Sequence, residues 1–575
     1  MQKIGIGYEN YKEFFDKNMY YVDKTLLIRD VIEKGGKVTL FTRPRRFGKT
    51  LALSMLRTFF ETEYDLSGNP VDNSRYFKGM KIMGADHGIL SMMGQHPVIK
   101  LTLKSAKQPD FRNAVLQLRN DIVSEIDRHG YLEDSAALSS NDLQQLQQLL
   151  TPKHIDNIEA EKDFQAEIGR YATALRSLSD WLYKHHGKNV VVLLDEYDVP
   201  LENAFLRGFY GEMVGFIRSL FESVLKTNDH LELAVVTGCL RISKESIFTG
   251  LNHLVINSIR DENFAESFGF TEGETEAMLR AYGMEDRIPE AKAWYDGYLF
   301  GTEEIYNPWS IISYVYSVVI KGRQFAEPQW ANTSSNDIIK EMVWNADDEM
   351  KWDLTTLIEG GAIEKRIHED ITYDDIHESE DNLWNFLYFT GYMKKVSERT
   401  EGEDVYVSMC IPNKEIRSIY RHQIQGWFEK QVKDADRKAF HKAILEQDTD
   451  GIADYVSDLL SKCISTFDSS EAFYHGYLLS LLYGVPGYLP QSNREEGEGR
   501  PDIVLYPDKW RDPAIIIEIK VVKQYNRMEG GIREAFDQIR DRKYEEGILE
   551  DGYMGVYSYG FCFCRKGCIV RKYEE

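Results

Sequence analysis

The sequence lacks any long hydrophobic run, and this absence bears on where the protein works. No stretch of its 575 residues approaches the ~18–20 consecutive apolar residues that a bilayer-spanning helix requires. The opening residues, MQKIGIGYENYKEFF, are too polar for the hydrophobic segment of a signal peptide. We therefore expect a cytoplasmic protein without a membrane partner.

Cysteine is also scarce, with six residues in the whole chain. Cys562, Cys564 and Cys568 lie close together near the C-terminus, and the other three are scattered. Cys562 and Cys564 would share one face of a strand, which suggests a metal site. However, no histidine lies beside them and the spacing is not a familiar zinc pattern. We favour a buried strand that contains small, soft side chains.

The sequence contains no internal repeat and no long low-complexity tract, and it has fewer basic than acidic residues. The formal net charge is −24, which argues against indiscriminate binding of nucleic acid, because contacts to phosphate dominate that affinity. A local basic site is still compatible with this balance. The 43% of apolar and 28% of charged residues are ordinary for a globular protein, and the length suggests about three domains.

Strand-like and helix-like segments alternate over the first 270 residues, a pattern typical of a parallel α/β sheet. Val38–Thr42, Val190–Leu194 and Leu233–Thr237 are apolar without alternation, as in strands buried on both faces. The pattern over 271–460 is mostly helical and carries no catalytic signature. The remainder, 461–575, predicts a compact mixed module in the order αββαβ. We therefore predict three domains, at 1–270, 271–460 and 461–575.

Residues 43–50, RPRRFGKT, follow the first of these strands and precede a helical segment, LALSMLRTFF. The phosphate-binding loop has the pattern G-x-x-x-x-G-K-[ST] between a strand and a helix, where backbone N–H groups bind phosphate. We therefore expect a nucleoside triphosphate, ATP above all. Lys49 would reach the β- and γ-phosphates, and Thr50 would hold Mg²⁺. The other expected nucleotide-binding residues of the loop are Arg45, Arg46, Phe47 and Gly48, whereas Arg43 replaces the first glycine of the pattern.

The second catalytic element is VVVLLDE, residues 190–196. A hydrophobic strand that ends in Asp-Glu supplies Asp195 to the Mg²⁺ shell and Glu196 to polarise the attacking water. The alternative is a buried strand that ends in a solvated acidic turn. In the segment LAVVTGCLR, Thr237 could contact the γ-phosphate. Arg241 could bind the negatively charged phosphates, either of the same chain or across a subunit interface. A simple strand end and a surface arginine explain these two residues equally well.

These segments resemble the predicted AAA-ATPase-like family of prokaryotes, which also shows the loop R-P-R-R-F-G-K-[ST]. The resemblance extends to LLDEYDVP, TGCLRISKESIFTGLNHL, WYDGYLFG, YNPWSI, NTSSND, FLYFTGYM and IPNKE, so that it covers nearly the whole chain. It implies a P-loop ATPase sheet in 1–270 and a PD-(D/E)XK nuclease-superfamily domain in 461–575. We interpret the mostly helical 271–460 as a lid or connector that reports the nucleotide state, and the alternative is a structural core that joins the two domains. In this light Arg43 is a family trait.

The C-terminal segment carries candidates for a nuclease metal site. That site needs two carboxylates to hold Mg²⁺ or Mn²⁺ and a lysine to orient water. Asp502 opens the strand DIVLY, while Glu518 and Lys520 would share one face of the strand AIIIEIK. Glu518 and Lys520 could also simply neutralise each other. The resemblance adds Gln538 on the following helix, and His475 lies on the first helix, where related nucleases often carry Glu.

Together these features predict an ATP-binding and ATP-hydrolysing protein coupled to a metal-dependent DNA endonuclease, with a role in defence against foreign DNA by analogy. From Arg500 to Glu545 ten basic and nine acidic residues give 10 − 9 = +1, which permits contact with DNA. The alternative is a nucleotide-gated switch whose C-terminal domain binds nucleic acid or a protein without cleaving it. A homo-oligomer is compatible with either function.

Overall fold

The computed structural model forms two compact units, residues 1–331 with 362–416 and residues 332–361 with 417–575. The structure describes residues 2–65, 68–151, 161–240, 247–248, 253–330, 339, 348–358, 360–368, 379–423, 437–461, 471–492 and 499–574. Arg241 therefore lies outside the described residues. No helix in the described part of the chain is long and apolar enough to cross a membrane.

The first unit is built on a five-stranded parallel sheet with the order β4-β5-β6-β1-β7. Its strands are buried because their sequences are apolar on both faces. The predicted α/β class is confirmed, and β6 separates the strand before the RPRRFGKT loop from the strand that ends in Asp195. The bounds are β1 (Val38–Thr42), β4 (Val98–Thr102), β5 (Val190–Asp195), β6 (Leu231–Gly238) and β7 (Leu254–Asn257).

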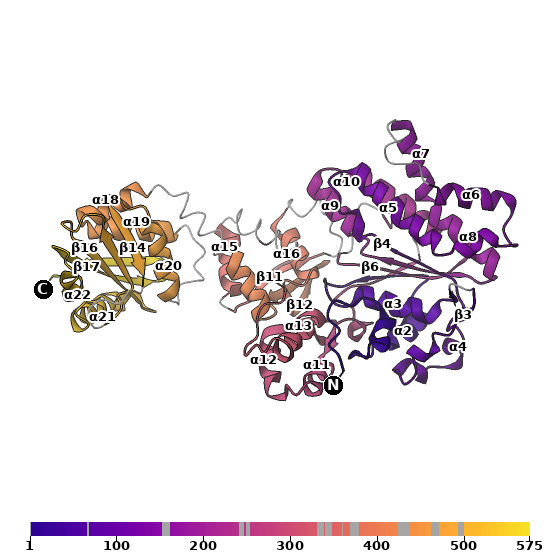
Figure 1. Ribbon diagram of the computed structural model, residues 1–575, viewed down its shortest axis with the longest axis horizontal. Helices are drawn as coiled ribbons and strands as arrows, with labels where there is room; N and C mark the ends of the chain where they lie inside the picture. Colours follow the sequence, from indigo (N-terminus) through magenta and orange to yellow (C-terminus); the bar gives the residue numbers. More distant parts are fainter. Residues whose placement is uncertain are drawn as a thin grey trace. The chain divides into compact units, whose positions relative to one another are not determined.

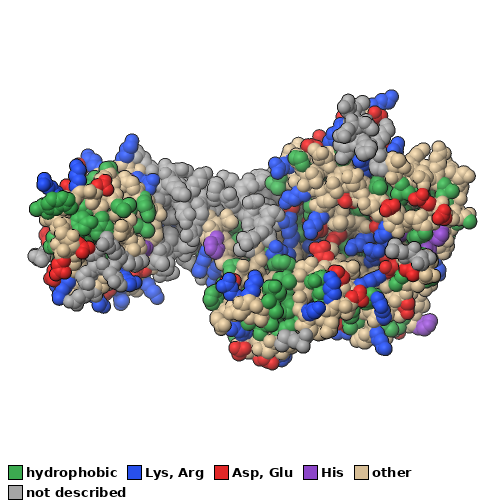
Figure 2. Space-filling view, viewed as in Figure 1, with side chains coloured by type: hydrophobic (Ala, Val, Ile, Leu, Met, Phe, Trp, Pro, Cys, Tyr) green, Lys and Arg blue, Asp and Glu red, His purple; other side chains and the backbone are tan. Residues whose placement is uncertain are grey.

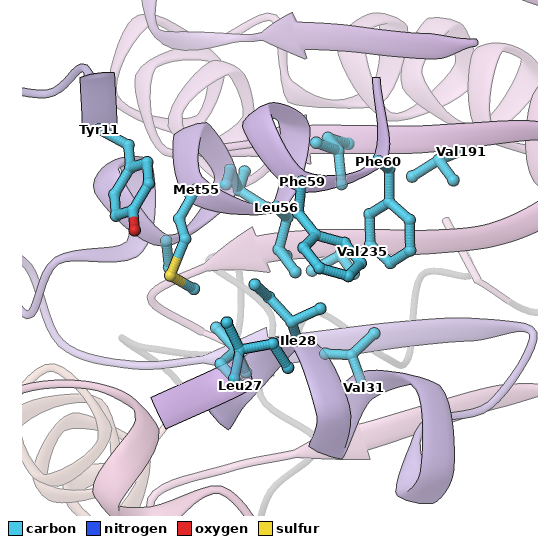
Figure 3. Close-up of a cluster of buried hydrophobic side chains, with 14 of the residues drawn as sticks. Tyr11, Leu27, Ile28, Val31, Met55, Leu56, Phe59, Phe60, Val191 and Val235 are labelled. Carbon is cyan, nitrogen blue, oxygen red and sulfur yellow. The ribbon is translucent and has the colours of Figure 1, made fainter. Parts of the chain in front are cut away.

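Helices cover both faces of this sheet (Figure 1). On one face lie α2 (Leu26–Lys34) and α3 (Lys49–Phe60), and on the other lie α5 (Phe111–Asp127), α8 (Ala174–His186), α9 (Val199–Arg207) and α10 (Tyr210–Phe221). α3 is apolar on most sides, so it packs against both the sheet and α2. Figure 3 shows Leu56 and Phe59 of α3 in one cluster with Ile28 of α2 and Val235 of β6. Burial of each such side chain stabilises the fold by about 1.5–3 kcal/mol, which holds the start of α3 in place.

The part of the first unit after residue 265 is mostly helical, as predicted, but it also contains two small sheets. Their strand orders are β8-β10-β9 and β11-β13-β12. The helices are α11 (Glu272–Ala281), α12 (Ile288–Tyr295), α13 (Pro308–Val319) and α16 (Glu380–Phe389). The strands are β8 (Phe270–Thr271), β9 (Tyr298–Phe300), β10 (Glu303–Tyr306), β11 (Ile363–Ile367), β12 (Lys394–Glu401) and β13 (Asp404–Cys410).

Local sequence explains where α13 begins. The Asn307 side chain accepts hydrogen bonds from the backbone N–H groups of Trp309 and Ser310, at 2.9 and 3.3 Å. Pro308 occupies the first turn, where its missing N–H has no helical partner to lose. The motif YNPWSI is therefore a helix start, and it places Trp309 beside the RPRRFGKT loop.

The second unit contains a five-stranded sheet with the order β14-β15-β16-β17-β18. Only the β16–β17 pair is parallel, because α21 and α22 connect these two strands. The strands are β14 (Tyr488–Ser492), β15 (Ile503–Pro507), β16 (Ala514–Val521), β17 (Val556–Cys564) and β18 (Gly567–Lys572). The helices are α15 (Asp348–Ile358), α18 (Lys438–Glu446), α19 (Thr449–Ser461), α20 (Glu471–Leu482), α21 (Met528–Asp541) and α22 (Tyr544–Glu550).

The observed order from α20 onward has three elements more than the predicted αββαβ, namely β14, α22 and β18. β14 is an edge strand, and it contains Pro490, which a strand tolerates at an edge because no ladder hydrogen bond is needed there. Lys543 adopts a left-handed backbone with φ 53°, which ends α21 and starts the separate helix α22. Cys562, Cys564 and Cys568 are buried in β17 and β18, as the predicted strand of small, soft side chains requires.

Candidate nucleotide site and candidate nuclease site

The RPRRFGKT loop joins β1 directly to α3, and two of its residues have a left-handed backbone. Gly48, immediately before α3, has φ 84°, a conformation that glycine adopts at no steric cost. Arg46 has φ 69°, which is strained for a residue with a side chain. Such strain persists where surrounding contacts over-determine it, and it brings successive N–H groups to the N-terminus of α3.

Arg43 explains how the loop dispenses with its first glycine. Its side chain is fully buried and donates hydrogen bonds to the carbonyl oxygens of Thr42 at 3.0 Å and Asn257 at 2.9 Å. The guanidinium also lies 5.6 Å from the ring centre of Phe268 and 5.2 Å from that of Phe300. Burial lowers the pKa of Arg43 to about 10. Arg43 is thus a structural anchor beneath the loop, and its position excludes direct contact with solvent.

The next three side chains of the loop contact protein. Arg45 forms an ion pair with Glu202 of α9. Arg46 donates to the carbonyl oxygen of Gln329 at 3.2 Å and lies 4.6 Å from the ring centre of Trp309. Phe47 is buried against the rings of Tyr298 and Phe300 of β9, so through its side chain it anchors the loop.

Lys49 points back into the loop. Its ammonium group donates to the carbonyl oxygens of Arg43 and Pro44 at 2.8 and 2.9 Å, and the Cys239 sulfur lies 3.6 Å away. Lys49 is only 6% exposed. A buried cation held by neutral carbonyl groups can interact more strongly with an anion, since charge-assisted hydrogen bonds are about twice as strong as neutral ones.

Three polar side chains from separate elements meet beside this loop. The Thr50 hydroxyl donates to one carboxylate oxygen of Asp195 at 2.7 Å, and the Thr237 hydroxyl donates to the other at 2.5 Å. They come from α3, β5 and β6, whose ends converge because β6 pairs with both β1 and β5. A hydroxyl and a carboxylate in contact, beside a phosphate-binding loop, form a set of oxygen ligands suited to Mg²⁺.

Glu196 follows Asp195 and has a left-handed backbone with φ 53°. Burial raises the pKa of its carboxyl group, and the charge of Asp195 adds to this effect. A strained residue and a raised pKa are both features of groups that transfer protons. Its place directly after Asp195 and its raised pKa are compatible with the predicted role of Glu196 as a general base.

Asp198 is a site residue that the sequence reading missed. Its carboxylate accepts hydrogen bonds from the backbone N–H groups of Cys239 at 2.7 Å and Leu240 at 3.3 Å. The Tyr197 hydroxyl donates to the carbonyl oxygen of Leu240. In the turn DEYD, Glu196 is half-buried and the other three residues are buried, and the turn is hydrogen-bonded to the residues that follow β6. The acidic residue two positions after Glu196 is the feature of the sequence that could have indicated this.

In the second unit, β15 and β16 bring Asp502 and Glu518 together. Asp502 immediately precedes β15, and its carboxylate accepts from the backbone N–H of Ile519 at 2.8 Å. Glu518 is fully buried; one of its oxygens accepts from Lys520 at 3.0 Å, while the other finds no hydrogen-bond partner among the described residues. Burial raises the pKa of Glu518 to about 7, and the nearby charge of Asp502 contributes. Burial also raises the pKa of Asp502.

Gln538 of α21 faces this pair through Lys520. The Lys520 ammonium donates to the Gln538 side-chain oxygen at 2.8 Å, and the Gln538 amide donates to the Tyr544 hydroxyl at 3.3 Å. Burial opposes the charge of Lys520, but Glu518 outweighs it and raises the pKa of the amine. Lys520 is thus held as a cation between a carboxylate and an amide, and Tyr544 extends the network as a residue not expected from the sequence.

His475 and Glu471, both on α20, differ in how they relate to this site. The Nε2 atom of His475 lies 2.9 Å from the carbonyl oxygen of Asp502 and 3.1 Å from the Ser492 hydroxyl, so the ring contacts the backbone rather than a carboxylate. Glu471, one turn earlier on the helix, contributes to the raised pKa of Lys520. The sequence reading missed it, although residues four apart on a helix share a face.

The two carboxylates fit a divalent ion on the evidence of the buried, unpartnered oxygen of Glu518. A buried carboxylate is costly unless a cation or hydrogen-bond donor satisfies it. The described residues contain no group of three or more His, Cys, Asp or Glu side chains placed to hold a metal. A hard cation such as Mg²⁺ binds through one or two carboxylates together with waters and substrate phosphates, so Asp502 and Glu518 are sufficient protein ligands.

Two family models match separate parts of the chain. Residues 5–248 match the family described as Predicted AAA-ATPase, and residues 469–573 match the PD-(D/E)XK nuclease superfamily. A protein of Azotobacter chroococcum mcd 1, named "Uncharacterized protein in vnfD 5'region", is 26% identical over 344 residues. The alignment covers 60% of this chain and 56% of that relative. The resemblance predicted from the sequence is confirmed, and the chain combines an AAA-ATPase-like domain with a PD-(D/E)XK nuclease-superfamily domain.

Proposed function

We propose that the first unit binds and hydrolyses ATP with Mg²⁺ and that this cycle controls a metal-dependent DNA endonuclease in the second unit. The observation that carries the proposal is the contact of Asp195 with both Thr50 and Thr237 at the start of α3. In a P-loop enzyme, a hydroxyl and an acidic residue of this kind hold the metal that bridges the phosphates. The unpartnered oxygen of Glu518 supports the second part.

The roles in hydrolysis follow from position. Lys49 would exchange its carbonyl partners for the β- and γ-phosphates, and the N–H groups at the start of α3 would bind the remaining phosphate oxygens. Thr50 and Asp195 would hold Mg²⁺, which neutralises charge on the phosphates. Glu196 would accept the proton of the attacking water, and Thr237 would orient that water or the γ-phosphate. Arg241 stays a prediction, since it lies outside the described residues.

At the nuclease site, Asp502 and Glu518 would hold Mg²⁺ or Mn²⁺, which activates water and stabilises charge on the scissile phosphate. Lys520, positioned by Gln538, would orient the attacking water. On the face that Figure 2 shows, basic and acidic side chains are interspersed. Because the chain carries a formal net charge of −24, binding to DNA would rest on local contacts near the site.

A test of ATP hydrolysis compares Lys49→Ala with Lys37→Ala, which removes an exposed lysine just before β1. We expect Lys49→Ala to lower the hydrolysis rate by roughly 100-fold or more, as loss of a charged donor to the phosphates does. Lys37→Ala should behave as wild type. Equal ATP binding and turnover by Lys49→Ala and wild type would overturn the proposed nucleotide site.

A test of DNA cleavage uses linear and supercoiled DNA with Mg²⁺ or Mn²⁺, in the presence of ATP, of ADP and of no nucleotide. Asp502→Ala should reduce cutting to the background of protein-free DNA, while Asp508→Ala, at the exposed end of the same hairpin, should not. We expect Glu196→Gln to bind ATP without hydrolysing it. If the ATP cycle controls the nuclease, this variant should cleave DNA at a different rate from wild type. Cutting that survives Asp502→Ala refutes the proposed nuclease site.

A second function is favoured by the ion pair between Glu518 and Lys520. If that pair persists without metal, the domain would bind nucleic acid or a protein, and ATP would act only as a gate. Calorimetric titration with Mn²⁺ separates the functions, because a nuclease site binds the ion and loses it in Glu518→Gln. A role in defence against foreign DNA accords with either function and would be tested by phage challenge of cells that carry Asp502→Ala.

A further inference from the structure

One buried carboxylate holds the two segments by which the chain leaves the first unit. The chain passes into the second unit after residues 331 and 416. Glu415, directly before the second of these points, is fully buried. One of its oxygens accepts hydrogen bonds from the backbone N–H groups of Gln329 and Trp330, at 2.6 and 2.8 Å. Glu415 therefore ties the segment before one exit to the segment before the other.

The peptide group of Gln329 joins this carboxylate to the RPRRFGKT loop. Its carbonyl oxygen accepts hydrogen bonds from the Arg46 guanidinium at 3.2 Å and from the indole N–H of Trp309 at 3.4 Å. The second oxygen of Glu415 accepts from the Ser310 hydroxyl of α13 at 2.7 Å. Linked hydrogen bonds polarise and strengthen one another. A change at Arg46 can thus reach Glu415 through a single peptide group.

Arg46 and Glu415 also affect each other as charges. Burial raises the pKa of Glu415, and the hydrogen bonds to its carboxylate together with the positive charge of Arg46 oppose this effect. Burial lowers the pKa of Arg46, and the negative charge of Glu415 opposes it. Hydrogen bonds to a charged acceptor are about twice as strong as those to a neutral one. The phosphates of a nucleotide on the loop would therefore compete with the Gln329 carbonyl for Arg46.

We propose that Glu415 is a latch that opens when ATP occupies the loop, an inference that rests on the proposed ATP site. The contacts above define the closed latch. When Arg46 turns to the phosphates, the Gln329 peptide loses a donor and Glu415 loses a nearby cation. The hold of Glu415 on the N–H groups of Gln329 and Trp330 weakens, and the segment before the first exit is released. The signal then reaches the second unit along the chain itself.

Thermodynamic coupling makes this latch reciprocal. If ATP opens the latch, a substitution that opens it must strengthen ATP binding, because a larger fraction of the protein is then competent to bind. Glu415→Gln preserves the size of the side chain and removes the charge that holds the N–H groups and attracts Arg46. Ser310→Ala removes one donor to Glu415, so it weakens the closed latch independently and remains informative if Glu415→Gln does not fold.

Glu290→Gln is the matched control. The Glu290 carboxylate accepts from the backbone N–H of Ala326 at 3.1 Å and from the Tyr314 hydroxyl. It therefore holds the same segment three residues before Gln329, through α12 and α13 rather than through the loop. The variant changes the same kind of contact and tests whether any weakening of this segment has the same effect.

Two measurements test the latch. Calorimetry measures the affinity of each protein for the β,γ-imido analogue of ATP with Mg²⁺. Hydrogen exchange, followed by mass spectrometry, measures the protection of the Gln329 and Trp330 N–H groups with and without the analogue. Thermal unfolding confirms that each variant is folded.

In wild type, we expect the analogue to speed exchange at Gln329 and Trp330 about fivefold or more. Glu415→Gln and Ser310→Ala should exchange faster there without nucleotide, and Glu415→Gln should bind the analogue about fivefold or more tightly than wild type. Glu290→Gln should match wild type in both respects. A merely structural role of Glu415 predicts the opposite sign, namely equal or weaker binding.

Unchanged exchange in a wild-type protein that binds the analogue would overturn the latch alone. Equal or weaker binding of the analogue by both latch variants would do the same. If wild type does not bind the analogue at all, the proposed ATP site fails and the latch fails with it.

Discussion

At the scale of single residues, two buried charges illustrate how the environment decides the role of a side chain. Arg43 is a cation held by carbonyl groups and aromatic rings, and it stabilises a loop. Glu518 is a carboxylate with one oxygen that finds no hydrogen-bond partner among the described residues, and burial raises its pKa to about 7. The Nε atom of Arg43 also lacks a hydrogen-bond partner among the described residues, so the two groups differ in their surroundings: Arg43 lies beside two aromatic rings, whereas Glu518 lies near a second carboxylate, that of Asp502.

Replacement of Arg43 by glycine would restore the common loop pattern, yet we expect it to destabilise the first unit by about 3 kcal/mol or more. The reason is the cavity left between Phe268 and Phe300, added to the lost hydrogen bonds. Chemical denaturation measures the effect, with Arg75→Gly, which removes an exposed arginine, as the control. A stable Arg43→Gly protein would contradict the anchoring role.

The raised pKa of Glu518 predicts a pH-dependent stability. The folded state binds the Glu518 proton more tightly than the unfolded state does, so without metal the second unit loses stability as pH rises from about 4.5 through 7. Glu518→Gln removes this loss. We expect the variant to be more stable than wild type by about 1–3 kcal/mol at pH 8, and no more stable at pH 4.

Denaturation in EDTA at several pH values measures this difference, and Glu550→Gln, which changes an exposed glutamate, is the control. A difference that stays constant with pH would contradict the assignment. Added Mn²⁺ should reverse the order above pH 7, because the ionised Glu518 of wild type then gains its cation.

At the scale of elements, the long apolar strands were predictable and the small sheets were not. β1, β5 and β6 are mostly apolar and almost entirely buried, and such runs identify strands from sequence alone. β8 has two residues and β9 has three, which are too few to show an alternation of apolar and polar side chains. Their form depends on partners distant in the chain, as in the pairing of Ile305 with Thr271.

The same contrast holds within the candidate sites. Lys49, Thr50 and Asp195 were predictable because a short pattern with flanking elements specifies them. The burial of Asp198 was not, because its partners are backbone N–H groups of residues 41 and 42 positions later. Likewise the side chains of Arg46 and Phe47 turn toward Trp309 and β9, a direction that only tertiary packing determines.

The start of α13 offers a test at this scale. Asn307→Ala removes the side chain that caps two N–H groups, so we expect the first unit to lose about 1 kcal/mol of stability. Asn307→Ser retains a capping oxygen and should lose less. Urea denaturation monitored by tryptophan fluorescence compares the three proteins. Equal losses in both variants would indicate that packing around residue 307 matters more than the cap.

At the scale of the whole molecule, the division into two compact units predicts two separable unfolding transitions. ATP with Mg²⁺ should raise the midpoint of one transition, and Mn²⁺ without nucleotide should raise the other. A ligand at 100 times its Kd stabilises its unit by about 2.7 kcal/mol. Scanning calorimetry of wild type, Lys49→Ala and Asp502→Ala would assign each transition, since each variant should lose one shift and keep the other.

A single transition that responds to both ligands would show instead that the units unfold together. The three domains predicted from the sequence divide the first unit at residue 270, and that boundary stays a prediction. Within the first unit, contacts such as that of Arg46 with Gln329 join the nucleotide loop to the helical region. Substitutions in α13 are therefore expected to change the melting of the ATP-responsive transition.

The anchoring of Arg43 has a consequence for how such chains can diverge. The guanidinium donates hydrogen bonds to the backbone carbonyl oxygens of Asn257 and Phe264, which lie 214 and 221 positions later in the chain. Both acceptors are backbone carbonyl oxygens, so these two hydrogen bonds do not depend on which side chains stand at 257 and 264. The side chains that would have to change together with Arg43 are the rings of Phe268 and Phe300, which lie against the guanidinium.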